Sequence, residues 1–491
     1  MGQYWILIAI LLPMIGGIAT RFLPFKKDSH MFLFVETAMI ATSLVVWGLL
    51  LGGTTDTFHV VHFVHDLSIS FKIDGLTMVF AGLVSVLWPL ATLYAFEYME
   101  HHERKNTFFM FYSIAYGVTL GIAFASDMLS MYFFYELLTL STVPLVMHTL
   151  KREAILASRK YLYYSLGGAA FALMGLVFLM VYGDTLEFTL GGVLSMDKIG
   201  ENAPMLLWIY LFAFLGFGVK AAIFPVSEWL PQAGVAPTPV TALLHAVAVV
   251  KAGVFAIIRL TYYSFGTDFL RGTWVQNAVM ALAIFTTVYG CSRAVKESHI
   301  KRRLAYSTVS NLSYIIFGAT IMTPLGLVGA LCHMVCHAVM KICSFMCAGA
   351  YMHQTGKKYI FDMDGIGRKM PIIFASLTLS GMGLMGVPGM AGFISKWNLA
   401  HAAVESENPL AYVGIAGLLV SALLTAIYMM TIVMRAFFPT ADFTDEQIQN
   451  VKDPGWKMCL PIVLCAVLTV LLGFFSAPLL QLFTDIATGI Y

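Results

Sequence analysis

A lysine stands inside a long apolar segment, five residues before a proline: Lys220 and Pro225 lie in the stretch GFGVKAAIFPVSEWLP, residues 216–231. An ammonium group is costly to desolvate in a bilayer, so an intramembrane lysine indicates a functional site. Glu136, in the apolar stretch MYFFYELLTLSTVPLV, has no neutralising residue near it in sequence and is the natural partner of Lys220. Such a pair predicts a proton switch, because small changes in its separation alter how strongly each group holds its proton. A static structural ion pair is the alternative interpretation.

Two more ionisable residues stand in the apolar segment PTPVTALLHAVAVVKAGVFAIIRL. His245 and Lys251 are six residues apart, which is about 240° around a helix, so a straight helix would not place them on one face. A proton relay through both therefore requires water or a local distortion. Lys251 is the stronger candidate, and a hydrogen-bonded core histidine is the alternative for His245.

The segment LCHMVCHAVMKICSFMCAGAYMH carries a stripe of three titratable residues. His333, His337 and Lys341 follow at i, i+4 and i+8 and rise by about 12 Å on one helix face. Imidazole takes a proton at one nitrogen and releases one from the other, so the stripe suits a relay. Zinc is the first rival, but a lysine one turn on and the lack of a carboxylate in this segment disfavour it. Haem is the second, and two histidines on adjacent turns cannot clamp one iron. We expect no metal and no cofactor.

A last lysine, Lys396, stands near the end of the stretch SGMGLMGVPGMAGFISKWN, residues 380–398, which is interrupted by glycine and proline. The Lys220 segment is interrupted in the same way, and the two segments are the seventh and twelfth apolar segments of the chain. Paired interruptions are typical of internal inverted repeats in transporters, and a spacing of five helices makes helices 4–8 and 9–13 run in opposite senses. The alternative is that Gly and Pro are simply common in membrane helices.

These residues need a membrane-spanning scaffold, which the composition predicts. The chain has 491 residues, 59% of them hydrophobic and 11% charged, with a mean hydropathy of +0.81. Runs of about 20 apolar residues, long enough to cross a bilayer as helices, recur throughout. We expect an all-α membrane protein whose first segment is a retained helix without the features of a signal peptide. The fourteen expected helices cover residues 4–23, 31–52, 75–97, 107–125, 127–149, 161–183, 204–224, 236–260, 273–292, 304–322, 325–350, 370–398, 409–436 and 458–482.

The distribution of basic residues predicts the orientation. Of the 29 Lys and Arg residues, 21 fall in loops that follow odd-numbered helices, whereas 4, among them Arg259, fall in the opposite loops or their margins. The positive-inside rule then places the first set of loops in the cytoplasm and both termini on the other side of the cell inner membrane. No linker is long enough to separate soluble domains, so residues 1–491 form one membrane domain. Its predicted parts are 1–98 (helices 1–3), 107–260 (first repeat), 273–436 (second repeat) and 458–491 (helix 14 and the C-terminus).

Other features of the sequence point away from other classes of protein. A net charge of +2 indicates no nucleic-acid partner, and the cysteines of residues 332–347, which fall in one apolar segment, lack metal-binding spacing. There is no phosphate-binding glycine loop, nucleophile elbow or cofactor fingerprint. His59, His62 and His65 could bind a metal, but their alternating pattern HVVHFVH favours an exposed loop or strand edge.

Four stretches resemble the antiporter-like subunits shared by respiratory complex I, Mrp cation/proton antiporters and energy-converting membrane hydrogenases. They are FYELLTLSTVPLV, FPVSEWLPQAGVAPTPVTALLHAVAVVKAG, IKRRLAYSTVSNLSYI and GVPGMAGFISK. The resemblance spans helices 4 to 13 and implies fourteen helices, two inverted five-helix repeats, broken helices 7 and 12, and a hydrated charged axis. By this resemblance, Glu136 corresponds to the family's helix-5 glutamate and Lys220 to the helix-7 lysine that pairs with it. Lys251 corresponds to the central lysine of helix 8, and Lys396 to the terminal residue of the series, on helix 12. The helix-11 histidines match the connecting relay.

The residues and the resemblance together predict a proton-translocating subunit of a multisubunit energy-converting complex. No reaction chemistry of its own is expected; it would be the ion-pumping subunit of an oxidoreductase (translocase) or of an antiporter. The expected partners are further antiporter-like subunits, an electron-transfer or small antiporter module, lipids, and H⁺ or Na⁺. The alternatives are a stand-alone cation/proton transporter, a membrane subunit that energises inorganic carbon uptake, and a quinone- or haem-binding electron carrier.

Overall fold

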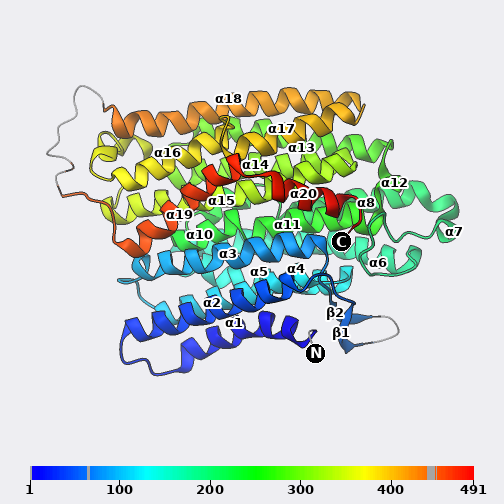
Figure 1. Ribbon diagram of the computed structural model, residues 1–491, viewed down its shortest axis with the longest axis horizontal. Coiled ribbons are helices and arrows are strands. Elements are labelled where there is room, and N and C mark those ends of the chain that lie inside the picture. The colour runs from blue at the N-terminus through cyan, green and yellow to red at the C-terminus, as the bar shows by residue number, and fades with distance from the viewer. Residues whose placement is uncertain (1–2, 64–66, 440–447, 449, 491) are drawn as a thin grey trace.

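The computed structural model describes residues 3–63, 67–439, 448 and 450–490, and it is an all-α bundle with one small hairpin. The long helices lie side by side, and both termini lie at the same end of the bundle (Figure 1). Twelve helical stretches of the described chain are long and apolar enough to cross a membrane. The other two of the fourteen expected helices are also present. Residues 304–322 lie in a more polar helix, and residues 370–398 lie in a broken one. The first six long helices are α1 (Tyr4–Phe22), α2 (Asp28–Leu51), α3 (Gly75–Tyr98), α4 (Lys105–Phe124), α5 (Met128–Val146) and α6 (Arg152–Tyr182).

The predicted interruptions of helices 7 and 12 are confirmed. Helix 7 comprises α7 (Met196–Ile199), η1 (Gly200–Asn202) and α8 (Ala203–Gly218), and after an irregular stretch the short α9 (Trp229–Ala233) follows. Helix 12 comprises α16 (Pro371–Met385) and α17 (Ala391–Glu405), and at the break Gly386 has φ +90°, which glycine adopts at little cost. Each break falls in the fourth helix of a predicted five-helix block, as an inverted repeat requires.

Two segments expected to be continuous are divided. Helix 8 consists of α10 (Thr238–Ala246), α11 (Val249–Ile258) and the π-helix η2 (Arg259–Phe265). No Gly or Pro stands at the α10–α11 junction, so the sequence carries no signal for it. The segment 458–482 divides into α19 (Trp456–Phe474) and α20 (Ala477–Ala487), because Pro478 in the first turn of α20 begins a new helix.

The second half of the chain contributes α12 (Thr267–Leu270), α13 (Trp274–Lys296), α14 (Ile300–Ile321), α15 (Pro324–Thr355) and α18 (Pro409–Phe437), with short 3₁₀ turns η3 (Ile360–Asp362) and η4 (Ile366–Arg368). The core centres on two stretches. Residues Thr238–Phe265 are buried throughout their most apolar window, and α15 is buried over 89% of its own. The candidate residues of helices 8 and 11 therefore lie in the interior.

The hairpin lies at the end of the bundle that carries the termini (Figure 1). Strand β1 (Phe58–His62) pairs antiparallel with β2 (Ser68–Phe71), and its outer residues are exposed. His59 and His62 are thus on an exposed strand, as the alternating pattern predicts, whereas His65 is outside the described residues. After β2, the Asp74 carboxylate accepts a hydrogen bond from the Thr77 backbone N–H and begins α3.

Candidate functional site

Lys220 lies in the irregular stretch after α8 and is 1% exposed. Its Nζ is 3.6 Å from Glu136 Oε1 on α5, so the predicted ion pair is present. The ammonium also donates to the Tyr135 carbonyl and lies 3.3 Å from the centre of the Tyr135 ring. The pair is asymmetric, because the Glu136 side chain is 22% exposed at the flank of α5. Lys220 does not snorkel toward the membrane surface.

Helix α11 packs directly against the backbone at Lys220. A Cβ on Gly253 would lie 2.3 Å from the Ala221 nitrogen and 2.7 Å from the Lys220 carbonyl carbon, so only glycine fits there. Gly253 is two residues beyond Lys251 in the same helix. The break of helix 7 and the Lys251 helix are therefore in contact, although the contact is through backbone and not between the two ammonium groups.

Lys251 is fully buried, and its Nζ is 2.5 Å from His337 Nδ1 on α15. At that distance one proton lies between the two nitrogens, so the pair consists of a donor and an acceptor: when one group is charged, the other is neutral. This contact joins helix 8 to helix 11. It is the closest approach between two of the titratable residues that the sequence analysis selects.

The stripe on α15 continues from His337 toward helix 12. The rings of His337 and His333 stack with their centroids 5.9 Å apart. His333 Nδ1 is 2.9 Å from Ser395 Oγ on α17, and Lys396 is the next residue. Lys251, His337, His333 and Ser395 therefore form a buried polar path from helix 8 to the break of helix 12.

Lys396 turns back to the end of α16. Its Nζ donates to the carbonyls of Leu384 and Met385, at 2.7 and 3.0 Å. These carbonyls lack helical partners because α16 ends there, and a cation is favoured at a helix C-terminus. The ammonium also lies 5.3 Å from the Tyr314 ring centre. The lysine thus stabilises the interruption in which it was predicted to lie.

Two predicted residues lie beside this path. His245 is fully buried, with its ring 4.8 Å from that of Phe345, and neither ring nitrogen has a hydrogen-bond partner among the described residues. The α10–α11 break lies between His245 and Lys251, which is the local distortion that their spacing requires. The Lys341 Nζ donates to Ser307 Oγ on α14 at 2.6 Å.

The charge balance along this path is one-sided. In the part of the chain that the structure describes, Glu136 is the one carboxylate within 4.0 Å of any lysine in the series. From Lys251 to Lys396, the titratable side chains of the path itself are all bases. Two neighbouring positive charges in a low-dielectric interior repel strongly, so the path accommodates few excess protons at a time.

The sequence analysis missed several buried polar residues. Arg259, assigned to a loop margin, is fully buried and forms a bidentate pair with Asp74, at 2.5 and 2.8 Å. Lys301, which lies just before the expected helix 304–322, is 3% exposed and donates to the Ala236 carbonyl at 2.6 Å. Both residues stand near the ends of apolar segments, where sequence position does not distinguish a loop charge from a buried one.

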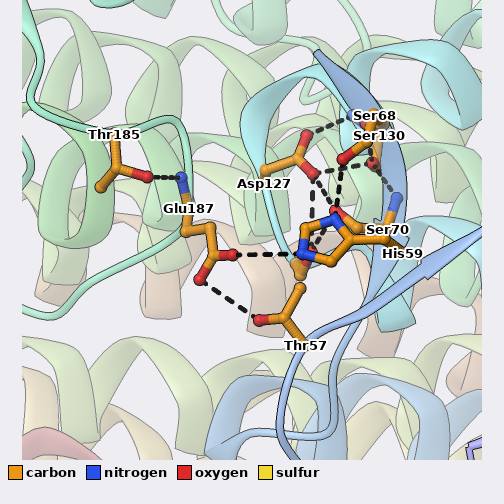
Figure 2. Close-up of polar contacts among 9 residues, drawn as sticks. Thr57, His59, Ser68, Ser70, Asp127, Ser130, Thr185 and Glu187 are labelled. Atoms are coloured by element: carbon orange, nitrogen blue, oxygen red, sulfur yellow. Dashed lines mark hydrogen bonds and ion pairs between the residues drawn. The ribbon is translucent and has the colours of Figure 1, made fainter. Parts of the chain in front are cut away.

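A cavity of about 760 Å³ opens beside the hairpin. Figure 2 shows its polar contacts: His59 lies near Glu187, at 4.0 Å, and its Nδ1 is 2.8 Å from Ser68 Oγ. Asp127, the N-cap of α5, accepts from Ser130 Oγ at 2.9 Å and also from Ser70. Desolvation raises the pKa of the Asp127 carboxyl, and the hydroxyl hydrogen bonds oppose this rise.

The helix-11 histidines use their Nδ1 atoms for hydrogen bonds, and their Nε2 atoms have no hydrogen-bond partner among the described residues. Nδ1 of His337 contacts an ammonium group, and Nδ1 of His333 contacts a hydroxyl. A metal ion at either of these nitrogens would displace its observed partner. The two rings stack side by side, so they also do not face each other across an iron.

Comparisons with known proteins find two family models and several relatives that match this chain. The family described as "NADH:quinone oxidoreductase/Mrp antiporter, TM" matches residues 125–425, and that described as "NADH-Ubiquinone oxidoreductase (complex I), chain 5 N-terminus" matches residues 62–109. NADH-quinone oxidoreductase subunit N of Desulforudis audaxviator is 27% identical over 97% of this chain and 96% of its own length. Na⁺/H⁺ antiporter subunit A1 of Staphylococcus aureus is 28% identical over 98% of this chain, which spans 62% of that protein.

Two solved structures share the fold. One chain of the Mrp complex from Dietzia sp. DQ12-45-1b superposes with a TM-score of 0.83 at 20% identity, over 100% of this chain and 97% of that one. One chain of the membrane-bound sulfane sulfur reductase, an archaeal respiratory complex, superposes with a TM-score of 0.85 at 23% identity. The superposition covers 99% of this chain and 97% of that one.

Proposed function

Because the chain belongs to the NADH:quinone oxidoreductase/Mrp antiporter family, we propose that it translocates protons as an antiporter-like subunit of a multisubunit energy-converting membrane complex. The complex is a dehydrogenase related to complex I, a membrane hydrogenase or an Mrp-type Na⁺/H⁺ antiporter. The orientation predicted by the positive-inside rule belongs to this proposal, with both termini on the non-cytoplasmic side of the cell inner membrane.

In this proposal Lys220 is the switch. While Glu136 is near, its charge favours the protonated ammonium of Lys220; when the pair separates, the buried ammonium loses that stabilisation and releases its proton. The irregular backbone around Lys220 provides the freedom to move. The proton then passes to Lys251, through His337 and His333, and on to Lys396. His245 and Lys341 adjoin this series.

The single observation that carries the proposal is the contact between Lys251 and His337. The nitrogens of these two fully buried, titratable side chains lie 2.5 Å apart, although the residues are 86 positions apart in the sequence. A structural hydrogen bond could be made by any donor and acceptor, whereas two bases that share one proton are suited to passing it on.

Substitution of Lys251 tests the relay. The complex is purified through a tag on this chain and reconstituted into liposomes that contain a pH-sensitive dye. Under an imposed membrane potential, Lys251→Met should lower proton flux by at least about tenfold, because a proton carrier is lost while its volume is kept. Lys198→Met is the matched control, since the Lys198 side chain is 48% exposed and pairs with Asp184 at the surface. Wild-type flux in the Lys251 variant would refute the relay.

The partner is expected at the flank of α5. Glu136 is partly exposed there, beside Phe133 and Leu140, which are 49% and 60% exposed. A subunit seated on this flank would reach Glu136 and could draw it away from Lys220. Sodium exchange is the second candidate activity, supported by the similarity to Na⁺/H⁺ antiporter subunit A1.

A further inference from the structure

A second set of buried polar side chains lies beside the lysine–histidine path. It comes from three helices, α13, α14 and α18, and every member is at most 1% exposed. We call it the hydroxyl–thiol network, and its members are Cys291, Ser307, Ser310, Tyr314, Ser421, Thr425 and Tyr428.

The network occupies one face of each of two helices. On α14 its members are three and four residues apart, and on α18 four and three, so each set forms a single stripe. Ser307 contacts Tyr428 and Ser310 contacts Ser421, so the two stripes run antiparallel and face each other. Cys291 of α13 closes the third side.

The network begins at Lys341. The Lys341 ammonium donates to Ser307 Oγ at 2.6 Å, and Ser307 Oγ is 2.5 Å from the Tyr428 hydroxyl. The Tyr428 hydroxyl in turn donates to Thr425 Oγ1 at 3.3 Å. These contacts connect Lys341 to two residues of α18.

The middle of the network is a triangle around the Cys291 thiol. Its Sγ is 2.8 Å from Ser421 Oγ and 3.0 Å from Ser310 Oγ, and these two hydroxyls are 3.0 Å apart. Thr425 Oγ1 is 3.6 Å from the same sulfur. The chain of hydrogen bonds from Lys341 is therefore continuous to Ser310 and Ser421.

The far end of the network lies next to Lys396. Tyr314 is one helical turn beyond Ser310, and its hydroxyl donates to the Leu418 carbonyl at 3.5 Å, in the turn before Ser421. The Tyr314 ring lies 5.3 Å from Lys396 Nζ and 5.0 Å from the His333 ring. Two routes thus lead toward the helix-12 break, one along the histidines and one along the hydroxyls.

Ordinary helix packing does not account for this pattern. Serine and threonine in membrane helices commonly bond to the carbonyl one turn before them, as Thr425 does to Ser421 at 2.7 Å. In the described part of the chain, however, the Oγ atoms of Ser307, Ser310 and Ser421 have only side-chain partners, and these belong to other helices.

We propose that the hydroxyl–thiol network conducts protons between Lys341 and Lys396 in parallel with His337 and His333. The Lys341 ammonium gives one proton to Ser307, each O–H or S–H group passes its own proton onward, and the neutral Lys396 amine takes up the last. Each intermediate group ends with as many protons as it began. The Thr425 hydroxyl, which donates to the Ser421 carbonyl, must turn toward Cys291, and the last step, past Tyr314, requires a water molecule or a rotation of that side chain. The inference rests on the proposed function, since it needs Lys396 to be a proton acceptor.

The test compares single and double variants in the reconstituted complex. Tyr428→Phe keeps the ring and removes the hydroxyl, Cys291→Ala removes the thiol, and Cys291→Ser restores a donor. Each is measured alone and together with His333→Gln, which interrupts the histidine route. The matched controls are Tyr210→Phe, which removes a buried hydroxyl paired with Thr261, and Cys465→Ala, which removes another buried cysteine. Lys396→Ala sets the level of a blocked path.

Two parallel routes predict that each single variant lowers proton flux by about two- to tenfold, in the range of one lost proton-transfer group. The double variants with His333→Gln should fall to the Lys396→Ala level, and Cys291→Ser should recover most of the flux that Cys291→Ala loses. If Tyr428→Phe and Cys291→Ala change nothing in the His333→Gln background, the network is packing and the inference is wrong. If Lys396→Ala itself conducts as wild type, the proposed function fails, which is a distinguishable result.

Discussion

At the scale of single residues, the cost of burying a charge explains most of what the site contains. Lys220 is tolerated because Glu136 and the Tyr135 carbonyl and ring neutralise it. Lys396 is tolerated because it binds the free carbonyls at the end of α16. Lys251 has a neutral partner in His337. Each ammonium thus has a different compensation, and only that of Lys220 is an opposite charge.

The buried Arg259–Asp74 pair gives a prediction at the same scale. Asp74→Asn leaves the Arg259 guanidinium without its charge partner and should destabilise the subunit by about 3–5 kcal/mol. Asp184→Asn breaks the exposed pair with Lys198 near the same end and should cost less than about 1 kcal/mol. Thermal unfolding of the purified complex in detergent measures both. Equal, small losses would show that the Arg259–Asp74 pair is not stabilising.

At the scale of elements, interrupted helices position the site. Lys220 lies beyond the end of α8, Lys396 beyond the end of α16, and the break between α10 and α11 separates His245 from Lys251. Backbone groups freed at such ends are available to ions and to protonated side chains. The close approach of α11 to the Lys220 backbone fixes the relation between two of these elements.

The α11 contact is tested by adding one methyl group. Gly253→Ala would place a Cβ 2.3 Å from the Ala221 nitrogen, and the backbone must shift to accept it. We expect a loss of about 1–3 kcal/mol, as for other overpacked cores, together with slower proton flux. Gly167→Ala on α6 is the matched control, because no atom lies within 4 Å of its added Cβ. Unchanged stability and flux in Gly253→Ala would mean that this contact does not position Lys220.

What the sequence reveals about these elements follows from the strength of each physical signal. Glycine and proline mark the breaks of helices 7 and 12, and the i, i+4, i+8 spacing marks the stripe on α15. The break in helix 8 has no such residue and lies in a segment that is fully buried. The sequence places Arg259 and Lys301 in loops or loop margins, because a charged residue near the end of an apolar segment cannot be told from a loop residue by its position. In the structure both are buried. The members of the hydroxyl–thiol network are common residue types, so only their packing reveals them.

At the scale of the whole molecule, the chain is one membrane bundle whose titratable residues run from the flank of α5 to the break of helix 12. The path starts at the partly exposed Glu136 and continues inward to fully buried bases. This arrangement suits a subunit that receives a signal at one flank and moves protons in its interior. Under the proposed function, its energy source would lie in a neighbouring subunit.

The central claim is that the Glu136–Lys220 pair switches proton release. The most direct measurement is proton flux through the assembled, reconstituted complex carrying Glu136→Gln or Lys220→Ala, with assembly checked by co-purification of the other subunits. We predict that both variants assemble normally and that flux is abolished in each, because neither can alternate between a paired and an unpaired ammonium. Wild-type flux in both variants would contradict the claim.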